Sequence, residues 1–350
     1  MDMNIKKTAI TIVMCSLLGA CASNKDEPKE FDGSLYAGKP VESLTNEEPP
    51  KTEMEAITRG DAALSTKNYD LALYEYLRSL SFSDATHQNQ TLYTVGRIHT
   101  AKGNIRLAEK AYTQALDHDK NDVKSLEELG LLYTKQGLTP EGQSYFFRAI
   151  SADQVRLNNP NVLKSHSEVT GDTLQGLPYD SKSPFRSYMG LGILSDVESK
   201  YDIAKRYYER ALEINPRSTQ AMINLGYSHY MSGSYYLAQR ITNRALKTDP
   251  NSEKALNNLA LIYIALDDNR QALNIFKRHM TTPEALNNVG YFLMLRGKPD
   301  EAIPFLQQAI DKNPSYYKVA NENLERALSE VRLHKEQTLN KDEVTDTSKG

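Results

Sequence analysis

The residues best spaced for chemistry are the polar side chains of the stretch DHDKNDVKSLEE at 117–128. Four of them stand at the first, third, fifth and twelfth positions of a calcium-binding loop, namely Asp117, Asp119, Asn121 and Glu128. Asp122, however, stands where the sharp turn of such a loop needs glycine, and the residues from Val123 onwards are expected to start a helix. We therefore predict that the chain binds no metal here.

No other group of residues indicates an enzyme. The seven histidines are scattered without a His-Glu-x-x-His pair, and the sequence contains neither a Gly-x-Ser-x-Gly turn nor a phosphate-binding Walker loop. We interpret His99 and His229 as packing residues, because they occupy a position that repeated segments fill with large side chains. The sequence predicts no catalytic residues and no cofactor. The remote alternative is an enzyme that acts on envelope polymers through surface carboxylates.

Cys21 carries a different kind of chemistry, because the residues before it read MDMNIKKTAITIVMCSLLGA. Two lysines precede an apolar run of about a dozen residues, which is too short to span a bilayer and is typical of a secretory signal peptide. The motif Leu18-Gly19-Ala20-Cys21 resembles the bacterial lipobox, in which a signal peptidase cleaves before the cysteine and its sulfur carries a diacylglycerol. The alternative is an ordinary signal peptide followed by an incidental cysteine.

The lipobox resemblance implies that Cys21 is lipidated and that the mature chain is exported. Ala22, rather than aspartate, follows the cysteine, which implies the outer membrane of a Gram-negative bacterium, with the folded part facing the periplasm. Cys15 lies inside the predicted signal, so the mature chain would hold one cysteine and no intramolecular disulfide. With a net charge of −3, the 350-residue sequence shows no broad basic footprint for a nucleic acid.

Similar residues recur at a spacing of 34 along most of the chain. Glycine recurs at the fifteenth position of four repeated segments, where a first helix must end: Gly103, Gly137, Gly233 and Gly297. Small residues at positions 8, 20 and 27 allow two helices to approach, and large residues at positions 4, 11 and 24 fill the space around them. The pattern resembles the tetratricopeptide repeat over residues 53–316.

This resemblance implies an all-α fold, a superhelical solenoid of about seven helix-turn-helix repeats with a C-terminal capping helix. The expected organisation is a signal peptide at 1–20, a disordered tether at 21–52, repeats 1–3 at 53–156, an irregular insert at 157–184, repeats 4–7 at 185–316, a capping helix at 317–337 and a disordered tail at 338–350. The insert is either a tolerated surface insertion or a partner-binding flap that also divides the array.

One link in the array is short. The stretches KALNNLALIY (254–263) and EALNNVGYFL (284–293) lie 30 residues apart, because four residues that elsewhere hold the turn are missing after Phe276. Thr282 is expected to cap the next helix and Pro283 to begin it. We predict that this junction departs from the regular superhelical step.

The resemblance also implies a concave groove lined by the first helix of each repeat, chiefly through positions 2, 5, 9 and 12. In repeats 5–7 these positions give the candidate partner-binding residues Ile223, Tyr227, Tyr230, Asn257, Leu261, Ile264, Asn287, Tyr291 and Met294. Tyrosine and methionine can anchor a partner's side chains, and asparagine can bond to its backbone. In repeats 2 and 3 the same positions are more polar and include Tyr93, Arg97, Lys124 and Glu127. The alternative is that some of these aromatic residues pack between helices.

A lipobox followed by helical repeats without catalytic residues predicts a protein–protein interaction scaffold. The combination resembles the TadD lipoproteins of tight-adherence (Flp) pilus machines, which implies a role in assembling a pilus and its secretin. It is also similar to type IV pilus pilotins, although the insert at 157–184 departs from their compact arrays. A third resemblance is to adaptor lipoproteins that recruit peptidoglycan hydrolases. The expected partners are a secretin, pilus-assembly components or peptide segments, and the membrane through the N-terminal lipid.

Overall fold

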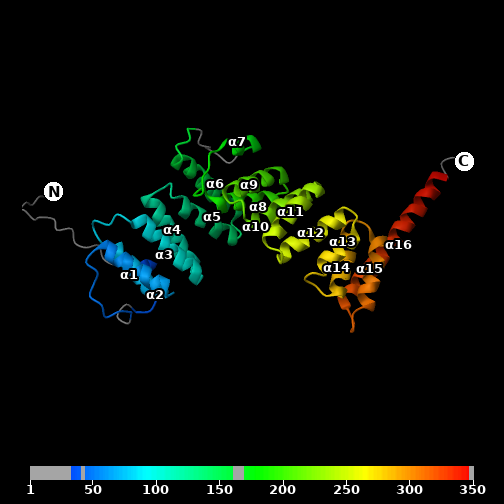
Figure 1. The fold of residues 1–350 in the computed structure, drawn as a ribbon, viewed down its shortest axis with the longest axis horizontal. Helices are drawn as coiled ribbons and strands as arrows, with labels where there is room; N and C mark the ends of the chain where they lie inside the picture. Colours follow the sequence, from blue (N-terminus) through cyan, green and yellow to red (C-terminus); the bar gives the residue numbers. More distant parts are fainter. Residues whose placement is uncertain (1–32, 41–43, 161–168, 347–350) are drawn as a thin grey trace, which may run out of the picture. The chain divides into compact units, whose positions relative to one another are not determined.

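The computed structural model describes residues 33–40, 44–160 and 169–346 (Figure 1). In these residues every regular element is a helix, and the chain divides into two compact units, Met1–Thr91 and Leu92–Gly350. None of the described helices combines the length and the apolar character needed to cross a membrane. The expected signal peptide and Cys21 lie outside the described residues.

The first unit contains the helical hairpin of repeat 1, built from α1 (Glu53–Ser65) and α2 (Tyr69–Ser79). Thr52 caps α1, because its side chain accepts the backbone N–H of Glu55 at 3.1 Å. The ring of Tyr76 lies directly against Gly60, and its hydroxyl donates to a carboxylate oxygen of Asp61 at 2.5 Å. A small residue on one helix therefore receives a large side chain from the other.

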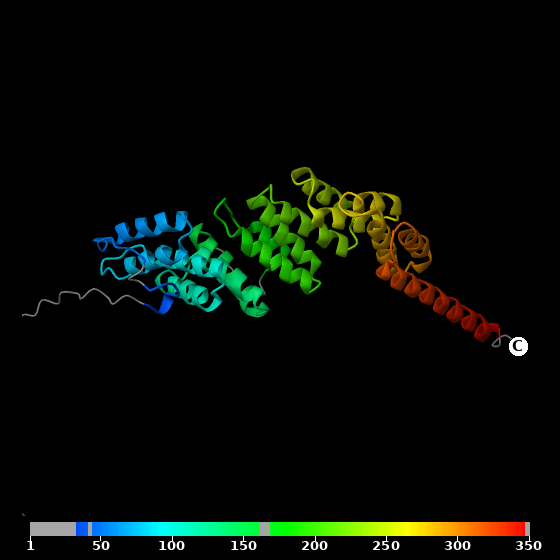
Figure 2. The ribbon, with the colours of Figure 1, turned by 90° about the horizontal axis from the view of Figure 1, so that it is seen from below.

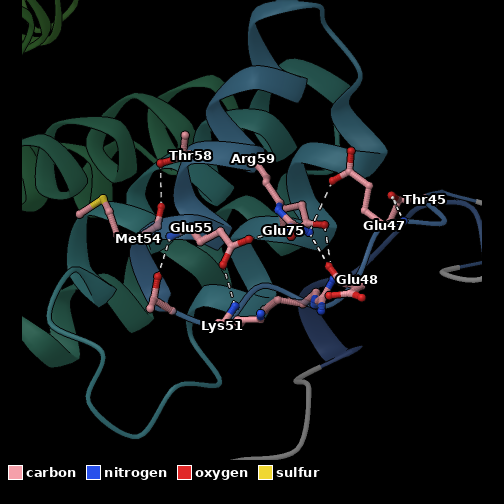
Figure 3. Close-up of polar contacts among 11 residues, drawn as sticks. Thr45, Glu47, Glu48, Lys51, Met54, Glu55, Thr58, Arg59 and Glu75 are labelled. Carbon is pink, nitrogen blue, oxygen red and sulfur yellow. Dashed lines mark hydrogen bonds and ion pairs between the residues drawn. The ribbon is translucent and has the colours of Figure 1, made fainter.

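The chain segment before α1 is attached to this hairpin by Arg59. The Arg59 guanidinium donates to the backbone carbonyl of Glu48 at 2.7 Å and lies 3.5 Å from a carboxylate oxygen of Glu47 (Figure 3). Farther upstream, Leu35 lies in the short 3-10 helix η1 (Gly33–Leu35) and is 1% exposed. The described part of the segment expected to be a disordered tether therefore contacts the first hairpin through Glu47 and Glu48.

The second unit contains the remaining helices. Its helices are α3 (Gln88–Lys102, which starts in the first unit), α4 (Ile105–His118), α5 (Val123–Lys135), α6 (Thr139–Arg156), α7 (Gly171–Gly176), α8 (Phe185–Val197), α9 (Tyr201–Ile214), α10 (Thr219–Met231), α11 (Tyr235–Thr248), α12 (Glu253–Ala265), α13 (Asn269–Phe276), α14 (Thr282–Leu295), α15 (Pro299–Asp311) and α16 (Lys318–Asp346). Figures 1 and 2 show the hairpins of this unit following one another in chain order. The expected all-α solenoid of helical hairpins is confirmed.

In the second unit, glycine contacts a large side chain both between the two helices of a hairpin and between neighbouring hairpins. A Cβ added at Gly192 of α8 would lie 2.5 Å from a ring carbon of Tyr208 on α9. The buried ring of Phe146 on α6 is enclosed from two sides, by Gly130 of its own hairpin and by Gly190 of the next one. In both places glycine is required because the ring occupies the volume that a Cβ would fill.

The turns inside the hairpins need a left-handed residue at the fifteenth position of the repeat. Four glycines take this conformation, with φ between 72° and 79°: Gly103, Gly137, Gly233 and Gly297. In three repeats without this glycine, the residues Lys67, Ser199 and Asp267 take it instead, with φ of 60°, 59° and 62°. The turn geometry is therefore kept even where the residue type does not favour it.

The short link begins after α13, which ends at Phe276 after only eight residues. Thr281, rather than Thr282, is the N-cap of α14. The Glu284 carboxylate accepts the Thr281 backbone N–H at 2.9 Å and its hydroxyl at 2.8 Å. Pro283 lies in the first turn, where its missing N–H has no helical partner to lose. The expected change in superhelical step at this junction stays a prediction.

The described part of the insert at 157–184 packs on the array. Leu174 of α7 and the nearby Leu177 are 1% and 5% exposed and belong to the same buried cluster as residues of α6, α8 and α9. Meanwhile α8 contacts both α6 and α5 directly. The hypothesis that the insert divides the array is therefore wrong, because the hairpins on either side of it touch. Residues 161–168 of the insert lie outside the described part of the chain.

Arg210 of α9 is expected to hold this insert in place. Its side chain is 4% exposed and donates to the backbone carbonyls of Leu174 and Gln175, the latter at 3.0 Å. Replacement with methionine should cost about 1.5–3 kcal/mol locally, which is about tenfold or more in the local opening equilibrium. We expect Arg210→Met to speed tryptic cleavage after Lys182, measured by mass spectrometry of timed digests. Arg217→Met removes one exposed tryptic site without touching the insert and is the control; equal cleavage rates in the two variants would contradict the prediction.

The C-terminal helix α16 is longer than the capping helix expected at 317–337. Ala320 and Ala327 are buried in clusters with residues of α14 and α15, as a capping helix requires. The helix then continues to Asp346, through most of the tail expected to be disordered at 338–350. The difference arises because Glu, Lys and Leu, which recur in this stretch, have high helix propensity.

Candidate partner-binding surface

The first helices of the later hairpins lie side by side in the second unit, since α8 contacts α10, α10 contacts α12 and α12 contacts α14. Positions 9 and 13 of these four helices form what we call the apolar stripe: Ile193, Val197, Tyr227, Met231, Leu261, Ala265, Tyr291 and Leu295. Five of its members are 38–77% exposed, namely Ile193, Val197, Tyr227, Met231 and Leu295. Large apolar side chains that recur on neighbouring helices while exposed indicate an interaction surface.

Three of the nine residues predicted for the groove belong to this stripe: Tyr227, Leu261 and Tyr291. Tyr230 and Asn257 are half-buried. The other four are 1–6% exposed and pack inside the array: Ile223, Ile264, Asn287 and Met294. Asn287, for example, accepts a hydrogen bond from Asn323 of α16 at 2.9 Å, so it cannot offer the same oxygen to a partner.

Four exposed members of the stripe were missed by sequence reasoning: Ile193, Val197, Met231 and Leu295. Three of them stand at position 13, one residue past the last position considered, and Ile193 lies in repeat 4, which was not included. The available signal was an apolar residue four positions after position 9 on the same helix, because residues i and i+4 share a face.

Asp196 of α8 connects the first two helices of the stripe, α8 and α10. One carboxylate oxygen accepts the Tyr208 hydroxyl of α9 at 2.8 Å, and the other accepts the Ser228 hydroxyl of α10 at 2.6 Å. Burial raises the pKa of Asp196 above its ordinary value, although these two hydrogen bonds oppose the increase. The carboxylate therefore ties the helix that carries Ile193 to the helix that carries Tyr227.

Replacing Asp196 with alanine should lower the unfolding free energy by about 1–3 kcal/mol, because two hydroxyls lose their acceptor. Asp196→Asn retains one acceptor oxygen and should lose less. Since the folded-state pKa is raised, the folded protein binds the proton more tightly, and this carboxyl's contribution to stability falls as pH rises from 3.8 through the raised value. Urea unfolding of both variants across this acid range would check the prediction, and a pH-independent difference between wild type and Asp196→Asn would contradict it.

The first helices at the other end of the second unit are charged. Arg186 of α8 binds both carboxylate oxygens of Glu128 on α5, at 2.6 and 3.3 Å. Glu127 accepts the backbone N–H of Ser187 at 2.8 Å, and burial raises its pKa. Lys124 lies over the ring of Tyr93 on α3, 5.7 Å from the ring centre. These contacts join α5 to α8 and α3 to α5, so the charged surface adjoins the apolar stripe.

The acidic side chains at 117–128 that resemble a calcium loop make other contacts: they cap a helix, stabilise a turn and form an ion pair. Asp122 caps α5 by accepting the Ser125 N–H at 3.0 Å, and Asp119 accepts the Asn121 N–H at 2.9 Å. Glu128 is turned to Arg186 instead of toward these residues. Among the described residues, no group of three or more His, Cys, Asp or Glu side chains is placed to hold a metal ion. A cavity of about 620 Å³ lies beside this turn, lined by Asp119, Asn121, Asp122, Val123, Lys124, Ala152, Val155, Arg156 and Lys182.

Comparisons of the sequence with known proteins agree with a fold of repeated helical hairpins. The tetratricopeptide-repeat family model matches residues 93–154 and 257–317, and the model of subunit 3 of the anaphase-promoting complex (cyclosome) matches 198–279. The chain is similar to the Photosystem I assembly protein Ycf3 of Prochlorococcus marinus (strain MIT 9303), with 31% identity over 119 residues that cover 34% of this chain and 69% of that protein.

Two solved structures are similar in fold. A tetratricopeptide repeat protein from Parabacteroides merdae ATCC 43184 is 18% identical, with a TM-score of 0.50 over 80% of this chain and 100% of that one. PilW, described as a widely conserved type IV pilus biogenesis factor, is 15% identical, with a TM-score of 0.48 over 66% of this chain and 94% of that one. The likeness to the Parabacteroides protein supports the fold alone.

Proposed function

Because this chain belongs to the tetratricopeptide-repeat family, we propose that it is a scaffold that holds a segment of another protein against the apolar stripe. The observation that carries the proposal is the exposure of Ile193, Tyr227 and Leu295, at 43%, 38% and 55%, on helices of one continuous row. When a partner covers such a row, apolar surface is removed from water, and this burial favours binding. Among the described residues along this row, Asp196 accepts two hydroxyl hydrogen bonds and Asp267 is paired with Lys298. Both carboxylates therefore connect neighbouring hairpins.

We further propose that Cys21 carries a lipid that anchors the scaffold in the outer membrane, facing the periplasm. In this place it assists the assembly of a tight-adherence (Flp) pilus and its secretin. The support is the lipobox at residues 18–21 together with an array that has no assigned chemistry. Labelling cells with a clickable fatty acid tests the anchor, since wild type should be labelled and Cys21→Ser should not. Label retained in the Cys21→Ser variant would overturn it.

The partner is tested by cross-linking in the native cell from Tyr227→Cys. If Cys21 is lipidated, the new cysteine is the one free thiol of the mature chain, so a thiol-reactive photo-cross-linker reports its neighbours alone. We expect an adduct with a secretin or a pilus-assembly protein, and no such adduct from the control Tyr236→Cys on α11. Adducts with peptidoglycan hydrolases would favour the adaptor function instead. Identical adducts from both positions would overturn the stripe as the binding surface.

A further inference from the structure

The first helices of the second unit carry a surplus of positive charge next to the apolar stripe. Arg97 of α3 and Lys124 and Lys135 of α5 are exposed, and none of the three forms an ion pair with a described residue. The acids nearby are already engaged, because Glu128 binds Arg186 with both oxygens and Glu127 binds the Ser187 backbone. The exposed charge at this end is therefore cationic.

These cations continue the same row of helices as the stripe. The contact of Lys124 with the Tyr93 ring places α3 beside α5, and the Arg186–Glu128 pair places α5 beside α8. At the other end, the acids of the stripe's surroundings are also engaged: Asp196 accepts two hydroxyls, and Asp267 is paired with Lys298 at 2.7 Å. A partner that follows the row thus passes from the apolar stripe to the cations on α5 and α3. These cations have no paired anion among the described residues.

We propose that the partner segment has two parts, an apolar part that covers the stripe and an acidic part that lies over Arg97 and Lys124. This inference rests on the proposed function and names the chemistry of the partner at that same surface. A basic segment would meet like charge at α3 and α5, whereas an acidic one supplies the missing counter-charge. Arg97 and Lys124 act as exposed charges, so their contribution is sensitive to salt.

The helix spacing sets where the acidic residues fall in the partner. Packed helices lie about 8–10 Å apart, so α5 is about 10 Å and α3 about 20 Å from α8. An extended chain advances about 3.3 Å per residue. The acidic residues of an extended partner therefore lie about three to six residues from the first apolar residue, the one that contacts Ile193.

Three fluorescent peptides test this with the full-length chain. Each has an apolar half of alternating serine and leucine that ends in leucine, a spacer of two serines, and four residues that are all glutamate, all lysine or all glutamine. Binding is measured by fluorescence anisotropy at low and at physiological salt. We expect the glutamate peptide to bind about tenfold more tightly than the lysine peptide, with a smaller advantage at the higher salt concentration.

Variants separate the charged surface from the stripe. Arg97→Glu combined with Lys124→Glu should reverse the preference, so that the lysine peptide binds best. The control, Arg106→Glu combined with Lys120→Glu, makes the same change in net charge on α4 and the turn after it, and should keep the wild-type order. Ile193→Asn, which adds no charge, should weaken all three peptides equally.

Each outcome decides one part of the inference. Equal affinity for the three peptides, or an unchanged order in Arg97→Glu/Lys124→Glu, overturns the acidic part and leaves the stripe as a docking surface. Loss of the preference in the Arg106→Glu/Lys120→Glu control as well would also overturn it, because general charge would then explain the binding. Binding that is absent for all peptides, or unaffected by Ile193→Asn, overturns the stripe and the proposed function with it.

Discussion

Replacing Phe146 with alanine should lower the unfolding free energy by about 3–5 kcal/mol, the range for a large aromatic side chain removed from a core. The ring is fully buried and is enclosed by Gly130 of α5 and Gly190 of α8. It therefore joins two hairpins across the position of the insert. Because a repeat array is stabilised by contacts between neighbours, the variant should also separate the unfolding of the two sides into distinct transitions in urea, followed by circular dichroism.

A double-mutant cycle gives the control for this prediction. Gly190→Ala alone should be strongly destabilising, because the new methyl group would overlap the Phe146 ring. In the Phe146→Ala background the ring is gone, so Gly190→Ala should cost far less. Additive losses, or a loss below about 1 kcal/mol for Phe146→Ala, would show that the ring does not join the hairpins as described.

Changing Ile193 and Tyr227 together to aspartate should reduce partner binding by at least about tenfold, since buried aromatic and aliphatic anchors carry most of the binding free energy of an interface. Both side chains are exposed in the chain alone, so the unfolding free energy should change by less than about 0.5 kcal/mol for each. The measurement is the yield of the adduct formed in cells from Tyr291→Cys, with and without the two substitutions.

Tyr236→Asp is the matched control for this second prediction. Tyr236 is 77% exposed, more than either target, but it lies on α11, a second helix of its hairpin. It should leave the adduct yield unchanged. An equal loss of adduct from Tyr236→Asp would indicate a general effect of negative charge, and an unchanged yield from the double variant would contradict the assignment of the stripe.

The fold followed from the sequence because its determinants are local. The glycine at position 8 and the large residue at position 24 of one repeat, such as Gly192 and Tyr208, are 16 residues apart and meet in the same hairpin. The turn glycines likewise act within a few residues. These patterns therefore predicted the number, the period and the pairing of the helices without knowledge of distant contacts.

The surface was predicted less well because exposure depends on what covers a helix. Position 5 was expected to line the groove, yet Ile223 and Asn287 are both 6% exposed, and Asn287 accepts a hydrogen bond from Asn323 of α16. The insert posed a related problem. Leu174 gave no helical period in a sequence rich in proline and glycine, yet it is buried in the cluster around Tyr207. Asn287 and Leu174 each contact a residue outside their own segment, so the sequence pattern of one segment could not predict either contact.

The attachment of residues 47 and 48 to Arg59 sets how far the molecule can stand from a bilayer. If Cys21 carries the proposed lipid, 25 residues, 22–46, separate the anchor from Glu47, the first residue paired with Arg59. Fully extended, these residues span about 90 Å, which is shorter than a free segment up to residue 52 would allow. Under the proposed anchoring, the first hairpin is therefore limited to this distance from the lipid.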